Sequence, residues 1–157
     1  MGSGKTTVGR TLANKLGWEF VDLDRTIAKE AARGIPEVFE QCGEEYFRDL
    51  EQRALAVALE GGPARVVACG GGIVVRPENR ERLKEVATVF LQEELGVLYE
   101  RTRGAGRPLR AASREDFERR YAERLAFYED VADLDVTVGG RAPQEVAEEI
   151  ARWLLGA

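Results

Sequence analysis

Hydrophobic residues recur along this chain with two periods that alternate. After the opening loop, apolar side chains stand four positions apart at Val8, Leu12 and Leu16, with Ala13 between them, and Gly17 follows. This spacing predicts a helix with one apolar face that ends at the glycine. A short apolar run that ends in acids comes next, "WEFVDLD" over residues 18–24. Such a run, bounded by loop residues, predicts a buried strand.

The alternation of strand-like and helix-like segments continues to the end of the chain. Further strands are predicted in "ARVVACGGG", "ATVFLQ" and "DLDVTV", at residues 64–72, 87–92 and 133–138. Helices are predicted over residues 26–33, 44–59, 77–86, 94–103, 113–131 and 143–155, with a short helical turn over 35–43. Strands that alternate with helices form parallel sheets joined by right-handed crossovers. We therefore expect an α/β fold, a three-layer αβα sandwich, formed by a single domain over residues 1–157.

The opening stretch "MGSGKTTVGR" matches most of a phosphate-binding loop. The full pattern, G-x-x-x-x-G-K-[ST], follows a buried strand, opens a helix and cradles nucleotide phosphates with backbone amides and a lysine. Gly4, Lys5 and Thr6 occupy its last positions, while its first glycine would precede Met1. Lys5 is expected to reach the β- and γ-phosphates of a nucleotide, and Thr6 to ligate Mg²⁺. The stretch that starts at Gly2 is therefore a candidate nucleotide site.

Two acids at the end of the first predicted strand form a second candidate. Asp22 and Asp24 are two residues apart, so alternation along a strand would direct both carboxylates toward the crevice beyond the strand ends. There, one carboxylate could hold Mg²⁺ through water and the other could accept the proton of an attacking hydroxyl. Alternatively, Asp24 caps the helix that follows. The phosphate loop one helix away favours the catalytic interpretation.

Three further features have both a structural and a functional interpretation. Arg48 lies one turn before Glu51 on a predicted helix, and Arg124 lies one turn before Tyr128 on another. Most arginines are solvated surface charges, although the guanidinium fork also matches a carboxylate bidentately. The glycines at 70–72 follow a strand, where they either form a simple turn or let the backbone approach a small polar ligand.

Composition excludes several classes of function. The 157 residues include no histidine, which excludes Ser-His-Asp and Cys-His nucleophile systems and makes a carboxylate the expected general base. Cys42 and Cys69 are far apart and are expected to be free thiols. A formal net charge of −5 argues against a nucleic-acid partner. We expect no membrane span and no signal peptide, hence a cytoplasmic protein.

The motifs together resemble the shikimate kinase family from Gly2 to about Val138. The shared motifs are a glycine-rich "GSGK[ST]T.GR.LA", a "D.D" strand end, "GE..FR..E", a strand into "GGG", an "RPL" lid and a late "R...Y...A". Six ordered motifs make a chance match very improbable. The resemblance implies a P-loop kinase fold with a parallel sheet of strand order 2-3-1-4-5. It also implies an enzyme that transfers the γ-phosphoryl group of ATP to the 3-hydroxyl of shikimate in aromatic amino acid (chorismate) biosynthesis.

The resemblance also implies roles for individual residues, with Mg²⁺ as cofactor and ATP as co-substrate. The implied nucleotide positions are Gly2, Ser3, Gly4, Lys5, Thr6, Thr7, Arg101, Arg107 and Arg141. The implied magnesium positions are Thr6 and Asp22, and the implied shikimate positions are Asp24, Arg48, Gly70, Gly71, Gly72 and Arg124. Lys5, Asp24 and Arg107 are the implied catalytic residues, with Asp24 as candidate base. Arg107 would move onto the transferred phosphate from a lid over about 103–114, and substrate-binding helices are implied at about 24–60.

The departure from the family pattern lies at the start of the chain. The family's phosphate loop follows a strand in the middle of the sheet, and no such strand precedes Gly2 in this sequence. Loss of five or six buried apolar residues at ~1.5–3 kcal/mol each would be comparable with the ~5–15 kcal/mol stability of a whole domain. We therefore expect the natural chain to begin roughly ten residues upstream, enough for one strand, with Met1 as an internal methionine.

Two other interpretations are open at this point. One is a related small-molecule kinase, such as a gluconate kinase or a nucleoside monophosphate kinase-like enzyme, although Arg48 and Arg124 favour a carboxylate-bearing polyol of shikimate's shape. The other is a kinase-like protein that binds nucleotide without turnover, against which the intact Lys5, Asp24 and Arg107 argue. The expected partners are shikimate and ATP, with no nucleic acid and no membrane, and the family resemblance suggests a monomer.

Overall fold

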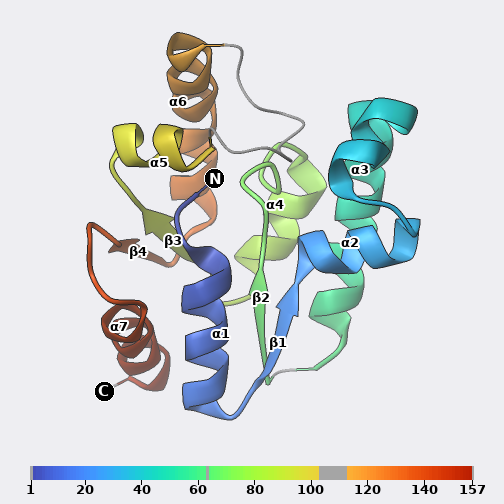
Figure 1. The fold of residues 1–157 in the computed structure, drawn as a ribbon. Coiled ribbons are helices and arrows are strands. Elements are labelled where there is room, and N and C mark those ends of the chain that lie inside the picture. The colour runs from blue at the N-terminus through green and yellow to red at the C-terminus, as the bar shows by residue number, and fades with distance from the viewer. Residues whose placement is uncertain (1, 63, 103–112, 157) are drawn as a thin grey trace.

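The computed structural model describes residues 2–62, 64–102 and 113–156, in which helices follow each strand (Figure 1). The elements are α1 (Lys5–Leu16), β1 (Glu19–Asp22), α2 (Leu23–Ala31), α3 (Ile35–Glu60), β2 (Arg65–Ala68), α4 (Pro77–Lys84), β3 (Val89–Gln92), α5 (Leu95–Thr102), α6 (Arg114–Val131), β4 (Leu134–Thr137) and α7 (Pro143–Leu155). Residues 103–112 of the predicted lid, Arg107 among them, lie outside the described residues, and Ser113 and Arg114 begin α6. Within the described residues, we find no helix with the length and apolar character that crossing a bilayer requires.

The strands form two parallel pairs. β1 pairs with β2, with Val21 opposite Val67, and β3 pairs with β4, with Leu91 opposite Val136. Among the described residues, no strand joins one pair to the other. The expected strand order, 2-3-1-4-5, numbers a strand before Gly2 as strand 1. In that numbering, the pair β1–β2 corresponds to strands 2 and 3, and the pair β3–β4 corresponds to strands 4 and 5. The α/β prediction is confirmed, with the sheet in two halves.

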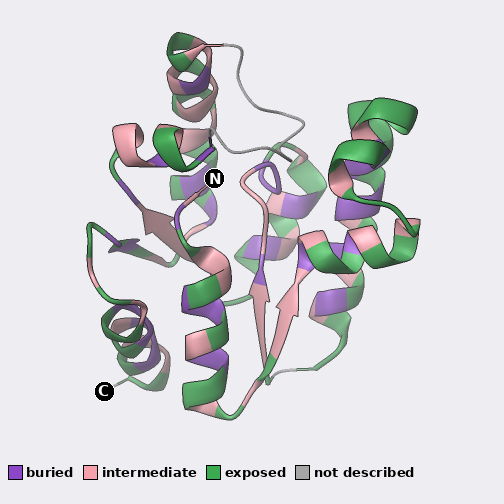
Figure 2. Ribbon diagram, in the orientation of Figure 1, coloured by how far each residue is buried: buried purple, intermediate pink, exposed green. Residues whose placement is uncertain are grey.

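Helices cover both faces of these pairs, which gives the three layers predicted from the sequence. Neighbouring side chains of β2 point to opposite faces, as the pleat of a strand requires. Val66 packs with the helices α1 and α7, and Val67 packs with α2, α3, α4 and α6. In Figure 2 the buried residues of the helices form stripes rather than whole turns, as expected for amphipathic helices.

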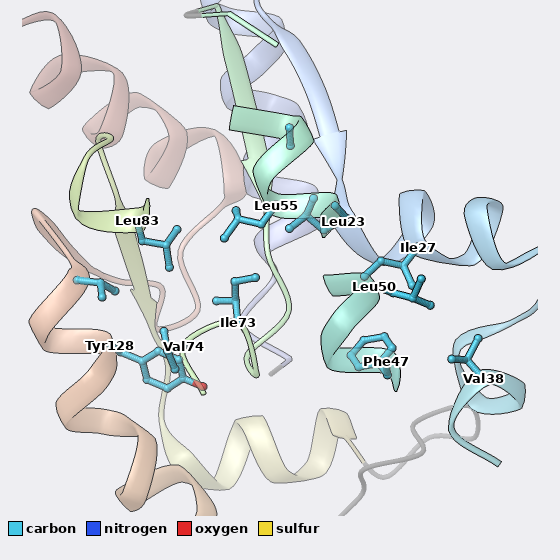
Figure 3. Packing of buried hydrophobic residues seen from close by; sticks show 13 residues of the cluster. Leu23, Ile27, Val38, Phe47, Leu50, Leu55, Ile73, Val74, Leu83 and Tyr128 are labelled. Atoms are coloured by element: carbon cyan, nitrogen blue, oxygen red, sulfur yellow. The ribbon is translucent and has the colours of Figure 1, made fainter. Parts of the chain in front are cut away.

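Two apolar clusters hold the layers together. Figure 3 shows the larger one, in which Tyr128 of α6 lies next to Val74 and Leu55 of α3 lies near Leu23 of α2. The members labelled there are Leu23, Ile27, Val38, Phe47, Leu50, Leu55, Ile73, Val74, Leu83 and Tyr128. The second cluster joins α1 and α7 to the strands through Val8, Leu12, Val136, Val146, Ala147 and Ile150.

Two helices that carry candidate residues differ in how well the sequence predicted them. The predicted turn over 35–43 and helix over 44–59 form one element, α3, with a kink at Gly43 (φ 81°, ψ 174°). The start of α6 was predicted from a cap at Ser113, and the Ser113 hydroxyl indeed accepts a hydrogen bond from the Asp116 amide at 3.1 Å. The Ser113 cap is therefore confirmed as a local signal, whereas the predicted division of α3 into two segments is a kink at Gly43 within one helical element.

The packing of α2 on α3 can be tested by truncating Ile27, whose side chain is completely buried. Ile27→Ala should lower the free energy of unfolding by about 2–5 kcal/mol, because it leaves a cavity between the two helices. Val57→Ala, on a side chain that is 66% exposed, should change it by less than about 0.5 kcal/mol. Chemical denaturation measures both variants, and equal losses would contradict this packing.

Candidate active site

The candidate phosphate loop leads directly into the first turn of α1. Gly4 is the N-cap residue and has φ 81°, a left-handed conformation that favours glycine, and Lys5 begins the helix. Ser3 is buried before it, while Thr7 is exposed on the first turn. The free amides and the positive dipole end of such a helix start attract an anion. This loop therefore has the backbone geometry that phosphate binding requires.

The two magnesium candidates lie in contact beside this loop. The Thr6 hydroxyl donates a hydrogen bond from Oγ1 to Oδ2 of Asp22, over 3.2 Å. A hydroxyl and a carboxylate are hard oxygen ligands of the kind that Mg²⁺ takes together with phosphate oxygens. In the part of the chain that the structure describes, no three Cys, Asp or Glu side chains form a metal site by themselves. The Thr6–Asp22 pair thus fits Mg²⁺ that is shared with a nucleotide.

The prediction that Asp22 and Asp24 lie on one face of the same strand is wrong. β1 ends at Asp22, and Asp24 lies in the first turn of α2. The helix starts earlier than predicted because the Asp22 side chain accepts a hydrogen bond from the Arg25 amide at 3.4 Å and so caps it. The capping role that we considered for Asp24 therefore belongs to Asp22.

Asp24 nevertheless reaches the glycine turn that follows β2. A Cβ atom on Gly70 would lie 3.4 Å from Oδ1 of Asp24 and 3.7 Å from Oε1 of Glu51. A Cβ atom on Gly72 would overlap the guanidinium of Arg48. A Cβ at position 70 would make ordinary van der Waals contacts, whereas at position 72 only glycine leaves room for the guanidinium of Arg48, which supports the close-approach interpretation at Gly72.

Arg48 and Glu51 form a buried ion pair on α3. Nη1 of Arg48 donates to Oε2 of Glu51 at 2.6 Å, and the two side chains are only 4% and 3% exposed. Burial raises the pKa of Glu51 because desolvation penalises the carboxylate, while the Arg48 charge acts in the opposite direction. The other edge of the guanidinium is turned toward Glu44, with Nε and Nη2 each 3.4 Å from Oε1. Glu51 thus fixes the orientation of the Arg48 fork.

Residues of α6 meet the same glycine turn from the other side. The Tyr128 hydroxyl donates a hydrogen bond to the carbonyl oxygen of Gly71 at 2.5 Å. Burial raises the pKa of Tyr128, while a side-chain hydrogen bond from Arg124 and the charges of Arg124 and Arg48 lower it. Arg124 and Arg48 thus both lie near Tyr128, whose hydroxyl binds the glycine turn, and their role in substrate binding stays a prediction.

The two arginines predicted near adenine have protein partners. Nη1 of Arg101 donates to the carbonyl oxygen of Gly2 at 3.0 Å and lies 3.3 Å from Oε2 of the buried Glu93. Arg141, in the loop after β4, pairs with Glu149 of α7 over 2.7 Å. Arg101 thus lies against the phosphate loop itself, and its assignment to adenine, like that of Arg141, stays a prediction.

Three residues of the site were not predicted as functional. Glu51 and Tyr128 were noticed only as helical neighbours of the candidate arginines, three and four positions away, and Glu93 was not considered. The signals were present, because residues three or four apart share one face of a helix. An acid directly after a parallel strand, such as Glu93 after β3, also lies at the edge of the sheet where ligands bind.

A phosphate loop, an oxygen pair suited to Mg²⁺ and a cluster of arginines around a glycine turn define the class as a P-loop kinase of small molecules. The family model described as shikimate kinase matches residues 1–155. The chain belongs to the shikimate kinase family, which consists of transferases that use ATP as co-substrate.

The similarity to individual relatives extends over most of the length of both proteins. The chain is 40% identical to a shikimate kinase of Persephonella marina, over 96% of this chain and 92% of that protein. It is 41% identical to a shikimate kinase of Symbiobacterium thermophilum, over 98% of this chain and 91% of that protein. A solved shikimate kinase of Acinetobacter baumannii, in complex with shikimate, superimposes with a TM-score of 0.93 at 34% identity, over 99% of this chain and 89% of that one.

The contact between α6 and the glycine turn gives a test of the site's geometry. Tyr128→Phe should lower the free energy of unfolding by about 0.5–1.5 kcal/mol, because the Gly71 carbonyl loses its donor while the ring packing is kept. Tyr121→Phe, on a neighbouring ring whose centroid is 6.3 Å away, keeps that hydrogen bond and should cost less. Denaturation curves of both variants decide the question, and the reverse ranking would count against the Tyr128–Gly71 bond.

Proposed function

We propose that this chain transfers the γ-phosphoryl group of ATP to the 3-hydroxyl of shikimate. The observation that carries the proposal is that Asp24, Arg48 and the glycine turn meet close to the Thr6–Asp22 pair. An acceptor pocket thus adjoins a phosphate site. The solved relative from Acinetobacter baumannii, which holds shikimate, supports shikimate as the acceptor.

The nucleotide half of the reaction is assigned to the loop before α1. The amides from Gly2 to Thr7 would hold the phosphates, and Lys5 would offset charge on the γ-phosphoryl oxygens as the transition state forms. Thr6 and Asp22 would hold Mg²⁺, which would supply positive charge to offset that of the phosphate oxygens. Arg107 is expected to add a further positive charge, and it stays a prediction because it lies outside the described residues.

The acceptor half is assigned to α2, α3, α6 and the glycine turn. Asp24 would accept a hydrogen bond from the reacting hydroxyl, orient it and take its proton as the new P–O bond forms. Phosphoryl transfer has a loose transition state in most descriptions, so the orientation of this hydroxyl matters more than the basicity of Asp24. The glycine turn would present backbone groups to the remaining hydroxyls, within a pocket of the concave kind that binds small ligands.

The carboxylate of shikimate would bind between Arg48 and Arg124. Arg48 is well placed for this role because Glu51 holds one edge of its guanidinium, which leaves the edge that is turned toward Glu44. The two 3.4 Å separations to Glu44 are long for a charge-assisted hydrogen bond, and the Glu44 side chain is 49% exposed. We therefore infer that the substrate carboxylate displaces Glu44 from Arg48.

The reaction can be tested by ADP release from MgATP, with shikimate or with gluconate as acceptor. We expect release that depends on shikimate and on Mg²⁺ and that does not occur with gluconate. Lys5→Met should lower kcat about 100-fold or more, the range for loss of one group that stabilises transition-state charge. Lys15→Met, at the exposed C-terminal turn of the same helix, is the matched control and should be fully active.

The outcomes of this assay separate the rival functions. Release with gluconate but not with shikimate would assign a different acceptor, and binding of ATP without any release would favour the non-catalytic interpretation. Circular dichroism of each protein is the control for folding, since the assay is informative only for a folded chain.

The proposed displacement of Glu44 predicts a specific change in KM. Glu44→Gln should lower the KM for shikimate by about 1.5- to 5-fold, since a partly exposed ion pair worth ~0.2–1 kcal/mol no longer competes with the substrate. The KM for ATP should not change. Glu45→Gln is the matched control, because the neighbouring Glu45 pairs with Arg76 at 3.2 Å and is 92% exposed. A higher KM for shikimate in Glu44→Gln would mean that Glu44 supports Arg48 instead.

A further inference from the structure

Arg101 ties the start of the phosphate loop to α5. Its Nη1 donates a hydrogen bond to the carbonyl oxygen of Gly2 at 3.0 Å. The two backbones also pass closely, since a Cβ atom on Gly2 would lie 3.2 Å from the Arg101 Cβ and 3.4 Å from the Leu98 carbonyl oxygen. In Figure 1 the segment that leads into α1 lies beside α5. The peptide after Gly2 is therefore held from the side of α5.

Glu93 in turn holds Arg101 in place. It follows β3 directly, its side chain is only 3% exposed, and its Oε2 lies 3.3 Å from the same Nη1 of Arg101. Oε1 accepts a hydrogen bond from the Glu94 amide at 3.0 Å, whereas the buried Oε2 accepts none from the residues that the structure describes. A buried carboxylate without a compensating charge is costly. The Glu93 carboxylate therefore keeps the guanidinium close, although 45% of the Arg101 side chain is exposed.

The bond from Arg101 determines the orientation of the peptide between Gly2 and Ser3. The Gly2 carbonyl and the Ser3 amide belong to one planar trans peptide, so they point in opposite directions. Gly2 has φ 68° and, as a glycine, tolerates either orientation of this peptide. Arg101 selects the one in which the carbonyl faces α5 and the amide faces away from it.

The Ser3 amide is a donor without an acceptor in the described part of the chain. Ser3 itself is buried, and the backbone amides of buried residues are normally paired. Gly4, on the other side of Ser3, also has a positive φ, 81°. Left-handed glycines next to ordinary residues turn successive amides toward one concave face, which binds anions. The amide that Arg101 orients is thus one that suits a phosphate oxygen.

We propose that Glu93 is a positioning residue for phosphate binding, which acts through Arg101 to hold the Ser3 amide in the orientation that donates to a nucleotide phosphate. The proposal rests on the nucleotide half of the proposed function. It gives Arg101 a role at the phosphates that requires no contact with adenine. Glu93 touches no ligand, and Arg101 neutralises a carboxylate that would otherwise repel the phosphates.

The size of the effect follows from the fraction of molecules whose peptide is correctly oriented. Without the Glu93 charge, Arg101 is a partly exposed side chain that can turn into water, and the peptide after Gly2 samples both orientations. If the correct one is then populated in about a tenth to a third of the molecules, the affinity for phosphates falls about 3- to 10-fold.

The test measures the Kd of MgATP and of inorganic triphosphate with Mg²⁺, which has phosphates but no base. Glu93→Gln removes the charge and keeps the size of the side chain, and Glu94→Gln, on the exposed neighbouring acid, is the matched control. We expect Glu93→Gln to raise both Kd values by the same factor, about 3- to 10-fold. In turnover, the KM for ATP should rise while kcat and the KM for shikimate do not change. Glu94→Gln should alter none of these values.

Arg101→Met and the double variant test whether the two residues act through one bond. Arg101→Met should weaken triphosphate binding at least as much as Glu93→Gln, and adding Glu93→Gln to it should cause no further loss. Arg101→Met should also lower Tm, because the Glu93 carboxylate is left unpaired, and the double variant should recover Tm. A structural role alone would change Tm without this pattern in triphosphate affinity.

Several results would overturn the proposal. They are a loss of affinity for ATP but not for triphosphate, which would place Arg101 at the base alone, an unchanged triphosphate Kd in Glu93→Gln, and additive losses in the double variant. If Glu93→Gln does not fold, an unchanged triphosphate Kd in Arg101→Met has the same meaning. Failure of the unaltered protein to bind either ligand would instead refute the proposed nucleotide site, and this inference with it.

Discussion

Parallel pairing of the strands is the constraint on which the rest of this structure depends. Strands that run in one direction end at one edge of the sheet, so the loops that follow them meet there. β1 ends at Asp22 beside Thr6, β2 ends shortly before Gly70, and β3 ends before Glu93, which holds Arg101. A phosphate site and an acceptor site thus become neighbours. This arrangement does not require contact between α1 and α3, the helices that carry their residues.

The acceptor side of the site contains two charged side chains, Arg48 and Glu51, that are buried away from water. Taking Arg48 and Glu51 out of water is costly, and the raised pKa of Glu51 shows that its burial outweighs the attraction to Arg48. A buried ion pair is weak evidence that the pair stabilises the fold. We interpret its effect as holding the Arg48 side chain in one orientation. With one edge of the guanidinium held at 2.6 Å, a ligand that binds the other edge immobilises a side chain that has already lost most of its freedom.

The sequence predicted the periodic elements and the chemistry of the motifs better than it predicted where single residues lie. Amphipathic spacing and the Ser113 cap are local signals, and they located α1, α6 and α7 closely. Asp24 was misplaced because a strand that continues and a helix that Asp22 caps are both compatible with the local sequence, and a single side-chain hydrogen bond decides between them. The partnership of Glu93 with Arg101 joins residues from different elements, so no periodicity could reveal it.

The phosphate loop and the middle of the sheet are physically coupled. Ser3 and Lys5 line an apolar cavity together with residues of β2 and β3, and Arg101 and the Thr6–Asp22 hydrogen bond tie the loop to α5 and to the end of β1. Segments with few buried apolar contacts open at low free energy. A ligand that needs such a loop ordered must meet that entropic cost when it binds, which lowers its affinity. The packing around this cavity therefore also affects nucleotide binding.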